Sequence, residues 1–218
     1  MRLTARRVFL CDALVAGSAL VVRLVYLAQY RGSSFYLVPL WDAGDYHRMA
    51  VALSHGALDP ALAFRAPLYP FLLGLVYMLF GSAPLIPRLV QIGMGTVSCL
   101  LVKRIGERLF GATAGSIAGL GAAFSGMMFY YDLELLPTAL AVFLYLLLIR
   151  ELLDLAAGGG SGLRAGVWLA LGALARPTVL TFFPFALWFV WRSAAARRGA
   201  VRLCVGCALP LAVSLGVH

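Results

Sequence analysis

Acidic and cationic side chains gather in short polar stretches that interrupt an otherwise apolar chain. Residues 41–50 read WDAGDYHRMA and residues 130–138 read YYDLELLPT, while Arg65 and Arg176 each precede a proline closely. A carboxylate in a membrane-embedded chain costs several kcal/mol to desolvate, so such stretches usually mark function. The acids could accept a proton from an incoming nucleophile, and the planar guanidinium groups suit the oxygens of a phosphate.

Asp42 is the candidate base of the first stretch. It precedes Tyr46 by one helical turn, and its alternative role is to cap a helix that starts near Ala43. Asp45 lies one turn from Arg48 and could pair with it or act as the acid itself.

Asp132 and Glu134 form the acidic pair of the second stretch. They could bind a divalent metal, or they could contact an acceptor and a basic residue. Alternatively, they could be solvated loop acids or cap the helix that starts near Leu135. If the protein uses a metal, these two are its expected ligands. Asp45, Tyr46, His47 and Tyr69 are expected to line the site. His47 is not expected to bind metal, because the chain has no HxxxH or HExxH spacing.

The composition identifies an integral membrane protein. The 218 residues are 62% hydrophobic and 12% charged, with a mean hydropathy of +0.92. The apolar blocks lack the alternation of β-barrel strands, so the fold is expected to be all-α. The net charge of +9 comes from basic residues between these blocks, which set membrane orientation, so no nucleic-acid partner is expected.

Charge also predicts the topology. The apolar blocks lie at about 8–28, 67–80, 86–102, 111–129, 135–149, 165–175, 178–191 and 200–217. If 67–80 lies at the interface within a long first outer loop, twelve of the eighteen basic residues fall on the N-terminal side: Arg2, Arg6, Arg7, Lys103, Arg104, Arg108, Arg150, Arg164, Arg192, Arg197, Arg198 and Arg202.

The positive-inside rule then favours about seven spans with a cytoplasmic N-terminus. Arg23 is expected to snorkel at the outer end of the first span. The two short blocks around Arg176 are expected to form a shallow hairpin with Arg176-Pro177 at its tip. All candidate site residues then face the non-cytoplasmic side, in a single module over residues 1–218.

Four segments, in order, carry a family resemblance: PLWDAGDYHRMA, FRAPLYPFLLGLVYMLFG, ERLFGATAGSIAGLGAAFSGMMFYYDLELLPTAL and GALARPTVLTFFP. Together they resemble the GT-C superfamily of membrane glycosyltransferases, nearest to glycosyltransferase family 39, which includes protein mannosyltransferases and the aminoarabinose transferase of lipid A.

This resemblance implies an inverting transfer of a sugar from a polyprenyl-phosphate carrier to a protein, lipid or glycan acceptor. It implies that Asp42 is the base or the acceptor-orienting acid and that Arg65 and Arg176 hold the donor phosphate. No cofactor other than a divalent metal is implied. Relatives commonly continue with further spans or a soluble domain, so the chain is expected to hold the catalytic module alone. The alternatives are a flippase for lipid-linked sugars and a non-catalytic fragment or subunit.

Overall fold

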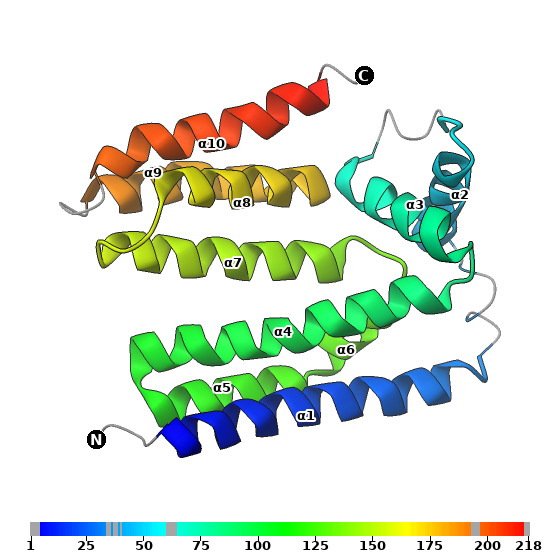
Figure 1. Ribbon diagram of the computed structural model, residues 1–218, viewed down its shortest axis with the longest axis horizontal. Coiled ribbons are helices and arrows are strands. Elements are labelled where there is room, and N and C mark those ends of the chain that lie inside the picture. Colours follow the sequence, from blue (N-terminus) through cyan, green and yellow to red (C-terminus); the bar gives the residue numbers. More distant parts are fainter. Residues whose placement is uncertain are drawn as a thin grey trace. The chain divides into compact units, whose positions relative to one another are not determined.

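The computed structural model describes residues 5–33, 36, 39, 41–59, 65–192 and 197–215. All regular secondary structure in this part of the chain is helical, which confirms the expected all-α class. The elements, in order, are α1 (Ala5–Tyr30), α2 (Trp41–Ser54), α3 (Leu68–Phe80), α4 (Leu85–Phe110), α5 (Ala112–Ala123), α6 (Gly126–Leu133), α7 (Thr138–Ala156), α8 (Gly162–Ala175), the 3₁₀ helix η2 (Pro177–Phe182), α9 (Phe183–Arg192) and α10 (Arg197–Leu215) (Figure 1).

The helix boundaries follow local chemistry. Gly111 separates α4 from α5 with a φ of 92°, a backbone conformation that glycine adopts without steric cost. Pro177 opens η2, a position where its missing N–H costs no hydrogen bond. The α-helix therefore ends at Arg176-Pro177, the expected tip of the hairpin, and the hairpin itself stays a prediction.

Two helices in the described part are long and apolar enough to cross a membrane, Arg6–Tyr30 and Leu85–Phe110. A third candidate is the pair α5 and α6, which meet at an angle of 50°. The block 111–129 was expected to be one straight span. It bends because Ser125 has an extended backbone, and its carbonyl accepts the N–H groups of Met128 and Phe129 to start a new helix.

Seven spans are not confirmed by these helices. The shorter apolar helices are Leu68–Phe80, Gly162–Ala175 and Gly199–Ala212. A straight helix needs about 20 apolar residues to span the hydrocarbon core, so length alone does not make these three spans.

The helices pack as two compact units. Unit 1 comprises residues 1–47 and 76–139, and unit 2 comprises residues 48–75 and 140–218. In unit 1, α4 packs along α5 and α1, with α6 against α4 and α1. Its core contains Val15, Cys99 and Ala123, all buried, and a second cluster forms around Ile92 and Leu133.

Unit 2 is built on the contact between α8 and α10. Its core joins these helices to α7 and α9 through the buried side chains of Leu152, Leu169, Val190 and Leu203. Residues 48–75 form the other part of unit 2, where α3 packs closely against α2. A Cβ added at Gly74 of α3 would lie 2.9 Å from the Cβ of Leu53 of α2.

Glycines bring α8 and α10 into backbone contact. A Cβ added at Gly166 would overlap the carbonyl oxygen of Leu203 and lie 2.7 Å from the backbone nitrogen of Cys207. A Cβ at Gly206 would likewise overlap the carbonyl of Leu163. Small residues allow this approach, which is the usual way in which apolar helices pack tightly inside membranes.

We expect Gly166→Ala to destabilise the protein by about 1–3 kcal/mol, because the two helix backbones must separate to admit a methyl group. Thermal unfolding in detergent, followed by circular dichroism, measures the change. Gly121→Ala is the matched control, since nothing lies within 4 Å of its added Cβ. Equal midpoints for the two variants would contradict close packing at Gly166.

Candidate functional site

Asp42 lies in the first turn of α2, which begins at Trp41. The side chain is exposed, and a carboxylate here also interacts favourably with the helix dipole. Trp41, which precedes it, has a φ of 52° and is 90% exposed. A non-glycine residue in this left-handed region is strained, and such strain concentrates at functional sites.

His47 anchors α2 to α3 within unit 1. Its Nδ1 lies 2.7 Å from the hydroxyl of Tyr77, and the two rings meet edge to face with centroids 5.4 Å apart. Burial raises the pKa of Tyr77 to about 12, so this group stays a hydroxyl at neutral pH. Burial, followed by the positive charge of Arg88, lowers the pKa of His47 from its ordinary value of 6.5. Sequence reasoning did not identify Tyr77 as the partner of His47.

We expect the contact between α2 and α3 to weaken as the pH falls below about 6.5. The unfolded chain protonates His47 near its ordinary pKa, whereas the folded chain resists protonation, so acid favours opening. Hydrogen exchange of α2, measured by mass spectrometry at pH 7.5 and 5.5 and corrected for the intrinsic pH dependence of amide exchange, tests this. His47→Gln keeps a hydrogen-bonding side chain and should abolish the pH dependence at α2. Identical acid sensitivity in this variant would assign the effect elsewhere.

Asp132 is buried in α6 and pairs with Arg23 of α1. The Nε of Arg23 donates to Oδ2 of Asp132 at 2.6 Å, and its other nitrogens donate to the carbonyl of Ala19 and to Sγ of Cys99. The expectation that Arg23 snorkels to the surface is wrong, because the side chain is fully buried. Asp132 is likewise not a solvated loop acid, since its side chain is 5% exposed.

Glu134 ends α6 with an extended backbone and takes a different set of partners. Its carboxylate accepts a hydrogen bond from the Tyr30 hydroxyl at 2.9 Å, and its carbonyl accepts one from Nε2 of Gln91 at 2.7 Å. Beside it, Arg88 donates to the carbonyls of Leu133 and Tyr36 and lies over the rings of Tyr30 and Tyr36.

Sequence reasoning missed Arg88, Gln91 and Tyr30. A signal for the first two was present: they stand three residues apart, on one face of the otherwise apolar first part of α4, residues 85–95. Polar groups in such a helix usually face protein partners rather than lipid.

In unit 2, Arg176 lies in the extended link between α8 and η2, with an exposed side chain. Its carbonyl accepts a hydrogen bond from the hydroxyl of Tyr145 of α7 at 3.3 Å. Arg65 lies just before α3 and is partly buried, and Tyr69 is buried in the first turn of that helix.

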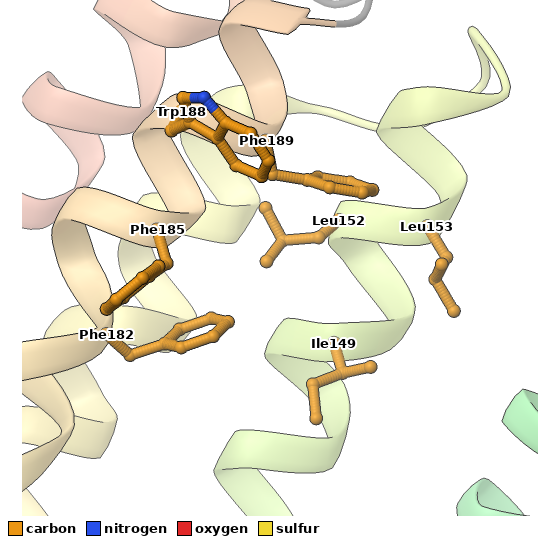
Figure 2. Close-up of a pocket in the computed structure, with 7 residues that line it drawn as sticks. All are labelled: Ile149, Leu152, Leu153, Phe182, Phe185, Trp188 and Phe189. Carbon is orange, nitrogen blue, oxygen red and sulfur yellow. The ribbon is translucent and has the colours of Figure 1, made fainter.

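An apolar groove of about 280 Å³ lies beside the Arg176 turn. Its walls come from α7 and from η2 with α9: Ile149, Leu152, Leu153, Phe182, Phe185, Trp188 and Phe189. Figure 2 shows Leu152 on the side of α7 that faces Phe182 and Phe189, whereas Leu153 points away from them. Tyr145, which contacts Arg176, precedes Ile149 by one turn of α7, so the Arg176 turn adjoins one end of the groove. The guanidinium of Arg192 lies 5.3 Å from the Trp188 ring, near the other end.

The candidate residues divide between the two units. Unit 1 holds Asp42, Asp45, Tyr46, His47, Asp132 and Glu134, and unit 2 holds Arg65, Tyr69 and Arg176. The convergence of Asp42 with Arg65 and Arg176 therefore stays a prediction. The side chains of Asp132 and Glu134 contact different partners, and no group of three or more His, Cys, Asp or Glu in the described ranges could hold a metal ion.

Comparison with known proteins gives one match. A family model described as dolichyl-phosphate-mannose-protein mannosyltransferase covers residues 64–216, which is more than half of the chain. The match includes Arg65, Asp132, Glu134 and Arg176, whereas Asp42 precedes it. No curated protein and no solved structure matches the chain.

Proposed function

Since this chain belongs to the dolichyl-phosphate-mannose-protein mannosyltransferase family, we propose that it transfers a sugar from a polyprenyl-phosphate carrier to a protein, lipid or glycan acceptor. The family match carries the proposal, and it fits a chain whose helices are long and apolar enough to lie in a membrane. The confirmed family identifies the chain as a membrane glycosyltransferase, and the donor, acceptor and stereochemistry are the proposal.

The proposed reaction is a single displacement. The acceptor hydroxyl attacks the anomeric carbon while the bond from that carbon to the phosphate oxygen breaks, and the carrier phosphate leaves with the electron pair. Asp42 takes the proton of the hydroxyl as general base. Attack from the face opposite the leaving phosphate inverts the anomeric configuration.

Arg65 and Arg176 are proposed to bind the carrier phosphate and to stabilise the charge that grows on it. The exposed position of Arg176 at one end of the apolar groove supports this assignment. A prenyl chain whose phosphate is held at Arg176 would continue along aromatic side chains such as Phe182 and Phe185. Burial of its methylene and methyl groups there contributes about 25 cal/mol per Å² of apolar surface.

The proposed topology places the site on the non-cytoplasmic face of the cell membrane, with a cytoplasmic N-terminus. Within unit 1, the two ends of α1 and α4 differ in charge. Lys103 and Arg104 pair with Asp12 at the end of α1 that also carries Arg6 and Arg7. Glu134 and Tyr30 lie at the opposite end, which agrees with a site away from the basic, cytoplasmic side.

The direct test uses purified full-length protein in lipid vesicles with polyprenyl-phosphate mannose radiolabelled in the sugar. We expect label to appear on an added acceptor peptide or glycolipid acceptor. Movement of the intact donor across the bilayer without transfer would instead favour a flippase. The absence of both activities would favour a non-catalytic subunit.

We expect Arg176→Ala to weaken binding of polyprenyl phosphate by roughly 10- to 100-fold, the usual effect of losing hydrogen bonds to a charged group. Equilibrium titration with polyprenyl phosphate in detergent measures it. Arg150→Ala is the control, because Arg150 is also a solvent-exposed arginine of unit 2 and its pairing with Asp154 is loose, at 3.9 Å. Equal affinities in the two variants would remove Arg176 from the phosphate site.

A further inference from the structure

The turn between α6 and α7 is held by contacts to its backbone. Arg88 donates to the carbonyl of Leu133 at 2.8 Å, and Gln91 donates to the carbonyl of Glu134 at 2.7 Å. Both donors are buried in α4, with 1% and 2% of their surface exposed. These bonds fix the conformation of the turn without the Glu134 carboxylate.

The Glu134 carboxylate is therefore an additional charge at a preorganised position. In the described part of the chain, its hydrogen-bond donor is the Tyr30 hydroxyl, at 2.9 Å from one of its two oxygens. Tyr30 is itself fixed, because the guanidinium of Arg88 lies 5.1 Å from its ring centroid and the Tyr36 ring meets it edge-on. A partly buried carboxylate costs free energy to desolvate, so retaining one that the turn does not need suggests a ligand.

Two further tyrosines lie near the Tyr30–Glu134 pair: the Tyr26 ring stacks on Tyr30 with centroids 6.2 Å apart, and the Tyr130 carbonyl accepts the N–H of Glu134. Tyr26 and Tyr130 both lie within electrostatic range of the Glu134 carboxylate. Tyr26 packs against Phe129 with ring centroids 5.0 Å apart, which fixes its orientation. Tyr130 packs against Tyr131 and remains 42% exposed, so it offers an accessible aromatic surface.

These groups select the chemistry of the ligand. An ionised carboxylate only accepts hydrogen bonds, so it binds hydroxyl groups and repels a phosphate. The guanidinium of Arg88 donates to two backbone carbonyls and is buried, so it does not present its N–H groups to a phosphate here. Aromatic rings close to a carboxylate that accepts hydrogen bonds suit a ligand with both apolar faces and hydroxyl groups. A sugar ring has both.

We infer that Glu134, positioned by the Tyr30 hydroxyl and close to the aromatic side chains around Tyr30, binds hydroxyl groups of a sugar. The inference rests on the proposed function, because the sugar belongs either to the lipid-linked donor or to a glycan acceptor. It assigns Glu134 a role separate from that of Asp132, whose carboxylate is occupied by Arg23.

Glu134→Gln tests this inference in the full chain. The amide keeps an oxygen for the Tyr30 hydroxyl, while the charge that would bind sugar hydroxyls is lost. Since Arg88 and Gln91 hold the backbone, the melting temperature should not change. Three probes are titrated in detergent: polyprenyl-phosphate mannose, the same polyprenyl phosphate without sugar, and octyl mannoside. Tyr30→Phe, which removes only the positioning hydroxyl, should show a smaller loss in the same titrations.

If the donor sugar is bound, Glu134→Gln weakens binding of the mannose-bearing lipid about tenfold and leaves the bare lipid phosphate unchanged. If an acceptor sugar is bound, the loss appears with octyl mannoside instead. Wild-type affinity of Glu134→Gln for both sugar probes, or no binding of either probe by the wild-type protein, would overturn the inference. Failure of the proposed function looks different, because the bare lipid phosphate would then not bind even to the wild-type protein.

Discussion

Replacing Asp42 by asparagine is expected to lower the rate of sugar transfer by roughly 10²- to 10⁴-fold, the usual contribution of a positioned general base. Asparagine keeps the shape of the side chain and its hydrogen-bonding capacity but cannot take the proton of the acceptor. The side chain is exposed in the first turn of α2, so the exchange should leave the fold intact. The measurement is the transfer rate at saturating polyprenyl-phosphate mannose, with the melting temperature as the check on folding.

Asp45→Asn is the matched control for this experiment. Asp45 follows Asp42 by about one turn of α2 and carries the same charge, but it is partly buried. A loss confined to Asp42→Asn assigns the proton to Asp42. A loss confined to Asp45→Asn would transfer the role to Asp45, and wild-type rates in both variants would exclude a carboxylate base on this helix.

Binding of the donor should survive Asp42→Asn, since the proposed phosphate ligands are Arg65 and Arg176. A general base acts in the transition state, so its removal lowers kcat without a matching change in donor affinity. Arg176→Ala should instead weaken donor binding and also lower kcat, because Arg176 is proposed both to bind the phosphate and to stabilise the charge that grows on it. This contrast separates the two roles even though the residues belong to different units of the structure.

The sequence was a good guide to features that depend on neighbouring residues. The turn at Arg176-Pro177 was predicted from the two short apolar blocks and the basic residues that flank them, and α8 ends there. The family was also predicted from four short segments, and the match over residues 64–216 confirms it.

Features that depend on distant residues were not predictable in the same way. Arg23 and Asp132 are 109 positions apart, and neither local pattern indicates that the other is its partner. Hydropathy likewise predicted a span at 135–149, but the helix found there, α7, continues to Ala156 and carries Arg150, Glu151 and Asp154. Apolar composition therefore located the helices better than it counted the spans.

Removing one partner of the ion pair between Arg23 and Asp132 should lower the free energy of unfolding more than other single changes in unit 1. We expect Asp132→Leu to destabilise the protein by about 3–5 kcal/mol, because it leaves the buried guanidinium without its counter-charge. Unfolding by a denaturing detergent, followed by circular dichroism, measures the change.

The double variant Arg23→Leu with Asp132→Leu distinguishes this cause from a simple loss of packing. Removing both charges eliminates the unpaired guanidinium, so the double variant should be more stable than Asp132→Leu alone. If the destabilisation of the double variant instead equals the sum of those of Arg23→Leu and Asp132→Leu alone, the two residues act independently. The ion pair would then not be what stabilises α6 against α1.

Gly95 provides a second test of the pair that leaves both charges in place. An added Cβ at Gly95 would overlap the carboxylate of Asp132 and lie 2.8 Å from Nε of Arg23. Gly93, two residues earlier on the same helix, has nothing within 4 Å of its added Cβ. Gly95→Ala should therefore destabilise the protein, whereas Gly93→Ala should be neutral or slightly stabilising, because alanine favours the helix. Since both variants make the same chemical change to α4, a difference between them would measure the space that the ion pair requires.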